Sequence, residues 1–95
     1  MMEEILQEVR KERARQDEKW GEQNHEPFAW MTILGEEYGE ACRGTLENRF
    51  GKGPLEAYRT ELIHTAAVAV AAVECFDRNK VGGTVDLNGF GCPRI

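Results

Sequence analysis

The chain has 95 residues, and its 17 Asp and Glu outnumber its 12 Lys and Arg, which gives a formal net charge of −5 at pH 7. A chain of this length buries only about 60–65% of the surface that it exposes when unfolded, so we expect a homodimer or homotetramer. The acidic balance argues against a protein that coats duplex nucleic acid, because affinity for phosphate backbones comes mainly from clustered Lys and Arg.

Residues 2 to about 18 are predicted to form a helix, since they are mostly good helix formers. This helix should pack by one end only, because its short apolar seam is followed by wholly polar sequence; the seam consists of Ile5, Leu6 and Val9. The stretch 20–27 contains a glycine and a residue before proline, both of which discourage helix, and is predicted to be a loop.

A second, longer helix is predicted from Pro27, a suitable first-turn residue, to about Asn48, before the glycines at 51 and 53. Its apolar residues recur at helical intervals and are expected to form the core stripe: Phe28, Met31, Leu34, Tyr38, Ala41, Cys42 and Thr45. A glycine inside a helix costs about 1 kcal/mol relative to alanine. Gly39 lies among acidic residues, and we therefore expect another group to approach the backbone there.

The third predicted helix opens near Pro54 and runs to about Asn79. Its residues 66–73 are apolar on every side, which requires more cover than two neighbouring helices supply. Four alanines in that run favour helix over strand. The prediction is an all-α helical bundle over residues 1–80, with two long helices and one shorter helix per chain, completed to four-helix bundles by oligomerisation. Residues 81–95 should form an irregular glycine-rich tail with a short hairpin at 84–87.

The cysteines are odd in number and show no C-x-x-C spacing, so we expect reduced thiols at Cys42, Cys75 and Cys92. The N-terminus begins Met-Met-Glu-Glu, without a basic region followed by an apolar one, and we therefore expect a cytoplasmic protein. The longest apolar run, residues 62–76, is interrupted by polar residues and is shorter than the about 20 apolar residues that cross a bilayer. No membrane association is expected.

Acidic residues cluster on the second predicted helix, where Glu36, Glu37 and Glu40 fall within an arc of about 100°. Such a cluster is compatible with a solvated surface, but like charges one turn apart are mildly destabilising and a cation would offset them. Glu61 and His64 share a face of the third helix, which would look at Glu37 and Glu40 if the helices pack antiparallel. Converging carboxylates of this kind hold divalent cations in helical bundles, whereas His64 alone also fits a core or interface histidine with satisfied nitrogens.

The spacing of these acidic residues resembles the signature of a known enzyme family. Glu37-x-x-Glu40, twenty residues and Glu61-x-x-His64 resemble the E-x-x-E, spacer, E-x-x-D signature of the MazG-like all-α nucleoside triphosphate pyrophosphohydrolases. The segment 12–27 is similar to small phage-type and bacterial MazG-like proteins. Its matches to the dCTP pyrophosphatase branch are Trp20, Gln23, His25 and Pro27.

The resemblance implies hydrolysis of a nucleoside triphosphate to the monophosphate and pyrophosphate, with Glu37, Glu40 and Glu61 as ligands of Mg²⁺. His64 occupies a position that usually holds Asp. Since magnesium prefers oxygen ligands and imidazole suits softer ions, His64 either shifts the preference towards Mn²⁺ or stays outside the coordination sphere. Glu36, next to the ligands, is the candidate base that orients the attacking water.

The resemblance also suggests residues that contact the substrate. Trp20 and Trp30 would stack on the base and His25 would hydrogen-bond the base or a phosphate. Trp20 also fits a loop anchor packed on the bundle, and Trp30 also fits a ring of the core. The family's C-terminal phosphate-binding helix has no counterpart here, and its nearest substitutes are Arg78, Asn79 and Lys80. The basic residues of the first helix fit a solvated face from which one arginine could reach phosphate in a dimer; they are Arg10, Lys11, Arg13 and Arg15.

The alternative hypothesis is a catalytically silent helical module that oligomerises or binds nucleotides without cleaving them. His64 in place of Asp and the missing C-terminal helix favour it.

Overall fold

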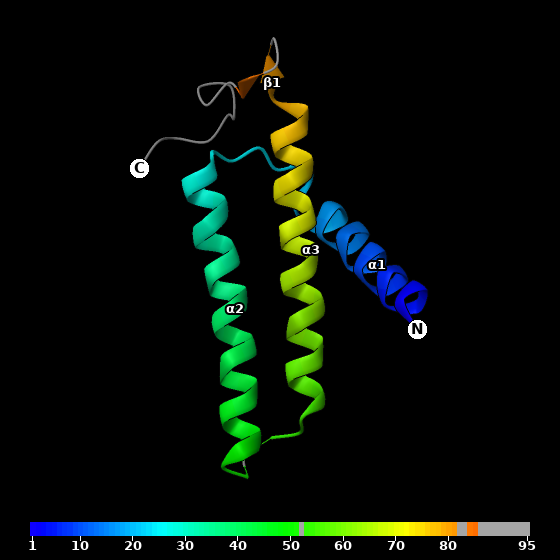
Figure 1. Cartoon of the computed structure of the whole chain (residues 1–95), viewed down its shortest axis with the longest axis vertical. Helices are drawn as coiled ribbons and strands as arrows, with labels where there is room; N and C mark the ends of the chain where they lie inside the picture. Colours follow the sequence, from blue (N-terminus) through cyan, green and yellow to red (C-terminus); the bar gives the residue numbers. More distant parts are fainter. Residues whose placement is uncertain (52, 82–83, 86–95) are drawn as a thin grey trace.

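A computed structural model describes residues 1–51, 53–81 and 84–85. It contains three helices, α1 (Met2–Trp20), α2 (Pro27–Arg49) and α3 (Glu56–Arg78), and these bounds lie within about two residues of the predicted ones. Figure 1 shows α2 and α3 side by side, running in opposite directions, while α1 leans away from α3 towards its N-terminus. The all-α prediction is confirmed, with one short antiparallel ladder added at the end of α3.

That ladder pairs β1 (Lys80–Val81) with β2 (Thr84–Val85), in the register Lys80 with Val85 and Val81 with Thr84. The hairpin was predicted to begin at Thr84, so the prediction missed its first strand. Residues 86 and 87 of the predicted hairpin, like most of the 81–95 tail, lie outside the described residues.

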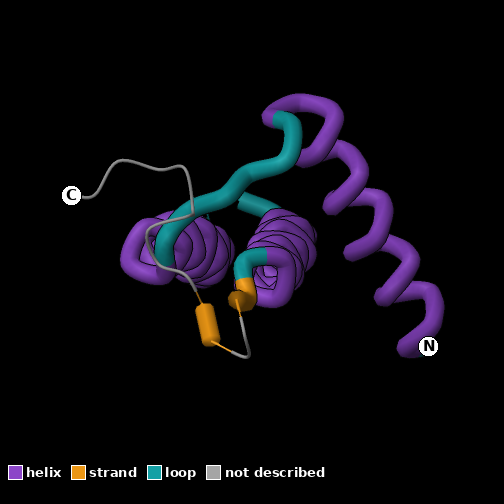
Figure 2. Tube along the Cα trace, turned by 90° about the horizontal axis from the view of Figure 1, so that it is seen from above, coloured by secondary structure: helices purple, strands orange, loops and turns teal. Residues whose placement is uncertain are grey.

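The start of α2 is fixed by its own sequence. The Glu26 carboxylate accepts hydrogen bonds from the backbone N–H groups of Phe28 (3.0 Å) and Ala29 (2.7 Å), and Pro27 occupies the first turn. The loop before it is tied to the end of α3, because the Arg78 guanidinium donates to the Gln23 carbonyl and to Asn24 Oδ1, both at 3.0 Å. This loop therefore spans the gap between α1 and the α2–α3 pair, as Figure 2 shows from above.

The core is small and lies between the first half of α2 and the second half of α3. Its buried members are Trp30, Val68, Ala71 and Cys75, with Ile33, Leu34 and Ala72 packed against them. Cys75 is fully buried, and Cys42 and Cys75 are free thiols as predicted, while Cys92 is outside the described residues.

The predicted core stripe of α2 is wrong for four of its seven residues. Ala41 is buried and Leu34 and Cys42 are partly so, but Phe28, Met31 and Tyr38 are 67, 64 and 64% exposed, and Thr45 is exposed as well. The face that meets α3 lies about 100° further round the helix, because α2 carries apolar residues on two faces and periodicity alone does not say which one is covered. Glu37 lies on this seam, since it shares the helical face of Trp30, Ala41 and Gly44.

Within the described chain, the close approach to the α2 backbone is found at Gly44 and not at Gly39. A Cβ added at Gly39 meets no described atom within 4 Å, whereas one added at Gly44 lies 3.2 Å from the backbone N and Cα of Tyr58. Gly44 is buried, and α2 and α3 make their closest backbone approach there among the glycines described. The reason for Gly39 is not found within one chain.

The α1 helix does not dock through its apolar seam. Ile5 and Leu6 are 39 and 44% exposed, contrary to the prediction that this end packs. Charged side chains join α1 to α3 instead: Arg13 Nη2 lies 2.7 Å from Glu74 Oε1, and Arg59 binds Glu8 with two hydrogen bonds of 2.8 and 2.5 Å. Figure 1 shows that α1 diverges from α3 towards its N-terminus, so the contacts between them begin at about Glu8.

Large apolar side chains remain exposed on the α2–α3 pair. At 100° per residue they point away from the seam and from the residues of α3 that meet α1. We call this set the outward face: Phe28, Met31, Tyr38 and Leu46 of α2, with Leu62, Val73 and Phe76 of α3. Among the described helices, none combines the length and the apolar character that crossing a membrane requires.

Candidate metal centre and cavity

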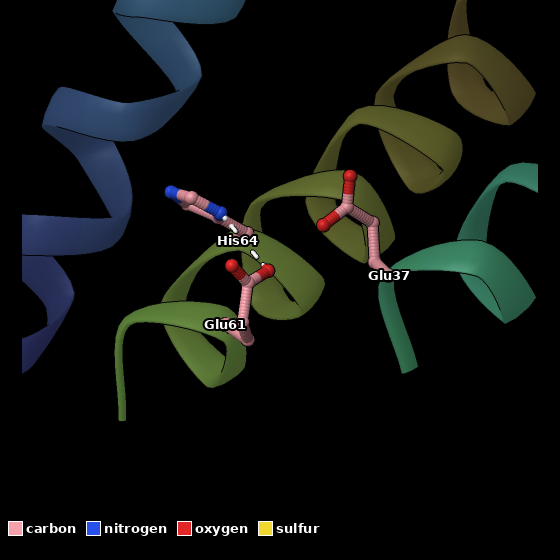
Figure 3. Close-up of side chains that lie close together, drawn as sticks. All are labelled: Glu37, Glu61 and His64. Atoms are coloured by element: carbon pink, nitrogen blue, oxygen red, sulfur yellow. Dashed lines mark hydrogen bonds and ion pairs between the residues drawn. The ribbon is translucent and has the colours of Figure 1, made fainter. Parts of the chain in front are cut away.

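Three predicted metal ligands come together where α2 crosses α3. Glu37 from α2 and Glu61 and His64 from α3 each offer one ligand atom, and these atoms lie within 4.8 Å of one another. His64 Nδ1 is 3.3 Å from Glu61 Oε2, and all three side chains are partly buried (Figure 3). Helical spacing explains this convergence, since residues three apart share a face of α3 and Glu37 lies on the α2 seam.

A third carboxylate, which no sequence pattern singles out, reaches the same place from α1. Glu12 is only 9% exposed, and its Oε1 lies 3.8 Å from His64 Nε2. His64 thus stands between the carboxylates of Glu12 and Glu61. In the sequence, Glu12 and Arg15 look like any surface pair one helical turn apart, so no local signal marked Glu12 as buried.

The carboxylates at this site differ in their proton affinity. Burial raises the pKa of Glu37 above its ordinary value of 4.5, the negative charges of Glu61, Glu12 and Glu40 raise it further, and only His64 opposes them. The pKa of Glu12 is lowered, chiefly by the hydrogen bond from Arg15. The Glu37 carboxylate is therefore the group that a cation would stabilise, while Glu12 already has a positive partner.

A cavity of about 480 Å³ opens beside these residues and runs between the three helices. Glu12, Glu37 and His64 line one part of it, and Trp20, His25 and Trp30 line another. Glu37 follows Trp30 by two helical turns, so the charged and aromatic parts are about 10 Å apart along α2. The volume of the whole cavity is within the range of pockets that bind small molecules.

The aromatic part of the cavity is only partly satisfied in its hydrogen bonds. The rings of His25 and Trp30 meet edge to face at 4.9 Å, and His25 Nε2 lies 3.3 Å from Gln23 Oε1. His25 Nδ1 and Trp30 Nε1 are buried and have no hydrogen-bond partner among the described residues. Trp30 belongs to the core as well as to the cavity wall, whereas Trp20 is 60% exposed with the Lys19 ammonium 4.9 Å from its ring centre.

Several predicted site residues are not brought into the cluster. Glu36 is exposed and does not line the cavity, and Glu40 is exposed with its nearest cation, Arg43, at 3.8 Å. Both are rotated away from the seam that holds Glu37. Arg78 lines the cavity, but its guanidinium binds the loop before α2. Lys80 lies 3.4 Å from Asp77 and does not line the cavity.

Protein-family models, curated proteins and solved structures yield no match to this chain. The likeness to MazG-like enzymes therefore depends on the spacing of its acidic residues and the upstream Trp and His.

Proposed function

We propose that the protein is a metal-dependent nucleoside triphosphate pyrophosphohydrolase of the MazG-like all-α kind, which releases a nucleoside monophosphate and pyrophosphate. The observation that carries this proposal is the convergence of Glu37, Glu61 and His64, within 4.8 Å of one another, beside a cavity of about 480 Å³. Carboxylates from facing helices are a recurrent way to hold divalent cations in a helical bundle.

The donor set fits a divalent cation. Burial and neighbouring carboxylates raise the pKa of Glu37, so a metal would relieve a repulsion that the protein alone leaves in place. Glu37 and Glu61 would supply oxygen ligands and His64 a nitrogen, a mixture that suits Mn²⁺ better than Mg²⁺. When bound, the cation would neutralise the phosphate oxygens of the substrate and activate a water for attack on the α-phosphorus.

The chain's own residues would hold the rest of the nucleotide. Trp20 and Trp30 line the part of the cavity that suits a base, and the buried, unpaired His25 Nδ1 and Trp30 Nε1 are polar groups that a base edge would satisfy. Glu40 and Glu36 lie outside the three-residue cluster, so we assign them a weaker role; the charge of Glu40 contributes to raising the pKa of Glu37, after burial and the charges of Glu61 and Glu12.

A second copy of the chain would cover the outward face. Exposed apolar patches are rare on monomers, and two α2–α3 pairs placed face to face would form the four-helix bundle expected from the sequence. The exposure of Met31, Tyr38 and Val73, at 64, 64 and 60%, supports this arrangement.

The function is tested by incubating the protein with each of the NTPs and dNTPs plus Mg²⁺ or Mn²⁺ and measuring pyrophosphate and monophosphate. Glu61→Gln should reduce turnover by more than about 100-fold, beyond the loss expected for a residue that only supports a ligand. The matched control is Glu47→Gln, an exposed acid of α2 that lies 3.8 Å from Arg43. Glu40→Gln should have an effect between these two, and His64→Asp should move the metal preference towards Mg²⁺.

The catalytically silent module remains the second candidate, because both ring nitrogens of His64 face carboxylates of the protein, as they would in a purely structural link. Absence of turnover with every nucleotide and both metals, in a protein that is helical and oligomeric, would favour this candidate and reject the enzyme.

A further inference from the structure

Three arginines line the cavity, and two of them join parts of the chain. Arg13 of α1 donates to Glu74 of α3 at 2.8 Å and is also 3.0 Å from Asp17, with only 14% of its side chain exposed. Arg78 of α3 holds the loop before α2. Neither guanidinium is available to a ligand without loss of a contact that supports the fold.

Arg15 is different, because its hydrogen bonds go to its own helix. It donates from Nε and Nη2 to the two carboxylate oxygens of Glu12, at 2.8 and 2.6 Å, and 54% of its side chain is exposed. A guanidinium has five N–H donors, and this pair uses only two of them. Glu12 is itself buried and accepts a further hydrogen bond of 3.3 Å from Gln16. Its carboxylate is therefore fixed in place, and it orients the Arg15 guanidinium.

The place of Arg15 is next to the candidate metal centre. It lines both the 480 Å³ cavity and an adjoining groove of about 330 Å³, and Glu12 and His64 line both spaces as well. The hydrogen bond and the charge of Glu12 raise the pKa of Arg15, and the more distant Glu37 carboxylate adds a smaller contribution in the same direction. A cavity with several carboxylates would repel a polyphosphate unless positive charge stood beside them.

We infer that Arg15 binds the phosphate chain of the nucleotide and that Glu12 is the positioning residue that holds its guanidinium towards the cavity. The inference rests on the proposed function, which makes a polyphosphate the ligand of this cavity. A planar guanidinium recognises phosphate oxygens with two parallel hydrogen bonds, which a lysine ammonium does not reproduce. The α1 helix would then be part of the site and not only a cover over it.

The test measures binding of inorganic tripolyphosphate to the full chain by calorimetry, with and without Mn²⁺. Arg15→Gln should weaken binding at least about tenfold, and Arg15→Lys should restore part of the loss. The affinity of Glu12→Gln should lie between those of Arg15→Gln and the parent protein, because the guanidinium remains but is less well held. Arg10→Gln, an exposed residue of the same helix that lines neither space, is the matched control and should bind within about twofold of the parent protein.

Unchanged binding in Arg15→Gln, or no binding of tripolyphosphate by the parent protein, would overturn the inference. Circular dichroism of each variant ensures that a loss of binding is not a loss of helix, and the Lys variant provides a second reading if Arg15→Gln is poorly folded. This test can separate the role of Arg15 from the proposed function. If tripolyphosphate binding depends on Arg15 but no nucleotide is turned over, the binding role is retained and the enzyme is rejected. If Arg15→Gln turns over nucleotide with an unchanged KM, the enzyme is retained and the binding role is rejected.

Discussion

The two sides of the α2–α3 pair are made of opposite kinds of side chain. The side that faces α1 contains Glu37, His64 and a polar cavity, and the carboxylate of Glu12 is buried there. On the outward face, aromatic and aliphatic side chains are instead exposed to solvent; Phe28 is 67% and Phe76 46% exposed. The hydrophobic effect would favour the reverse arrangement in a chain that works alone.

This contrast supports the proposal that a second copy of the chain covers the outward face. The apolar surface that the third helix cannot bury against two neighbours is collected on one side, where a second copy can cover it. The charged residues are collected on the other side, where α1 shields them from water without filling the space. Each side can therefore be altered separately by mutation.

The largest effect is expected on the outward face. Met31→Glu and Val73→Glu, made separately, should each convert the oligomer to monomer or raise its dissociation constant more than about tenfold, because each places a carboxylate in an apolar contact. Light scattering coupled to size-exclusion chromatography measures the mass. Ala14→Glu adds the same charge at an exposed position of α1 and should leave the mass unchanged. A parent protein that is monomeric at high concentration would contradict the second-copy proposal.

The next effect concerns the attachment of α1. Arg13→Ala removes the guanidinium that binds Glu74 at 2.7 Å and Asp17 at 3.0 Å, and should cost about 1–2 kcal/mol. Hydrogen exchange should speed up in α1 while α2 and α3 keep their protection, since their seam is untouched. Arg59→Ala, at the more exposed pair with Glu8, should cost less than about 1 kcal/mol. Equal acceleration in all three helices would show that α1 does not dock as a separate unit.

A smaller effect is expected from Glu37, and it has a defined pH dependence. The pKa of Glu37 is raised, so between 4.5 and that raised value the folded state binds more protons than the unfolded state, and stability falls as pH rises through this window. Glu37→Gln should therefore raise the Tm of the metal-free protein by a few degrees at pH 7, with the gain fading below pH 4.5. Mn²⁺ should raise the Tm of the parent protein but not that of the variant.

At the same site, Glu12 should change the stability with pH in the opposite direction to Glu37. Its pKa is lowered by Arg15, so its contribution to stability is present above 4.5 and is lost as pH falls through the lowered value. Glu12→Gln should lower the Tm at pH 7, and the difference should shrink in acid. If both variants moved the Tm in the same direction at pH 7, the assignment of one strained and one satisfied carboxylate would be wrong.

The helices could be predicted from the sequence because their limits are local. Pro27 and the glycines that follow Asn48 set the ends of α2, and alanine-rich sequence sets the type of α3. Part of the site followed from the same regularity, since three-residue spacing aligns Glu61 with His64 on one face. Which face of α2 is covered was not predictable, because Trp30 and Met31 are adjacent in sequence and both apolar, and only packing against α3 distinguishes them.

Glu12 could not be predicted for a related reason. Its burial depends on how α1 crosses α3, and that crossing is set by long-range pairs such as Arg13 with Glu74 and Glu8 with Arg59, which are more than 50 residues apart in the chain. No pattern within α1 specifies those partners. The sequence left open that Trp30 is a core ring and Trp20 a loop anchor. The structure places Trp30 in the core and leaves Trp20 60% exposed.

The last comparison concerns two glycines of α2. Gly39→Ala should stabilise by up to about 1 kcal/mol through helix propensity, because a Cβ there meets no described atom within 4 Å. Gly44→Ala should gain less or lose stability, since its Cβ would lie 3.2 Å from the Tyr58 backbone and force the helices apart by a few tenths of an ångström. A difference of about 1 kcal/mol corresponds to about 4–8 °C in Tm for a domain of this size, which thermal circular dichroism resolves. If Gly39→Ala instead lowered both the Tm and the oligomer mass, the glycine would be explained by close packing against a second copy.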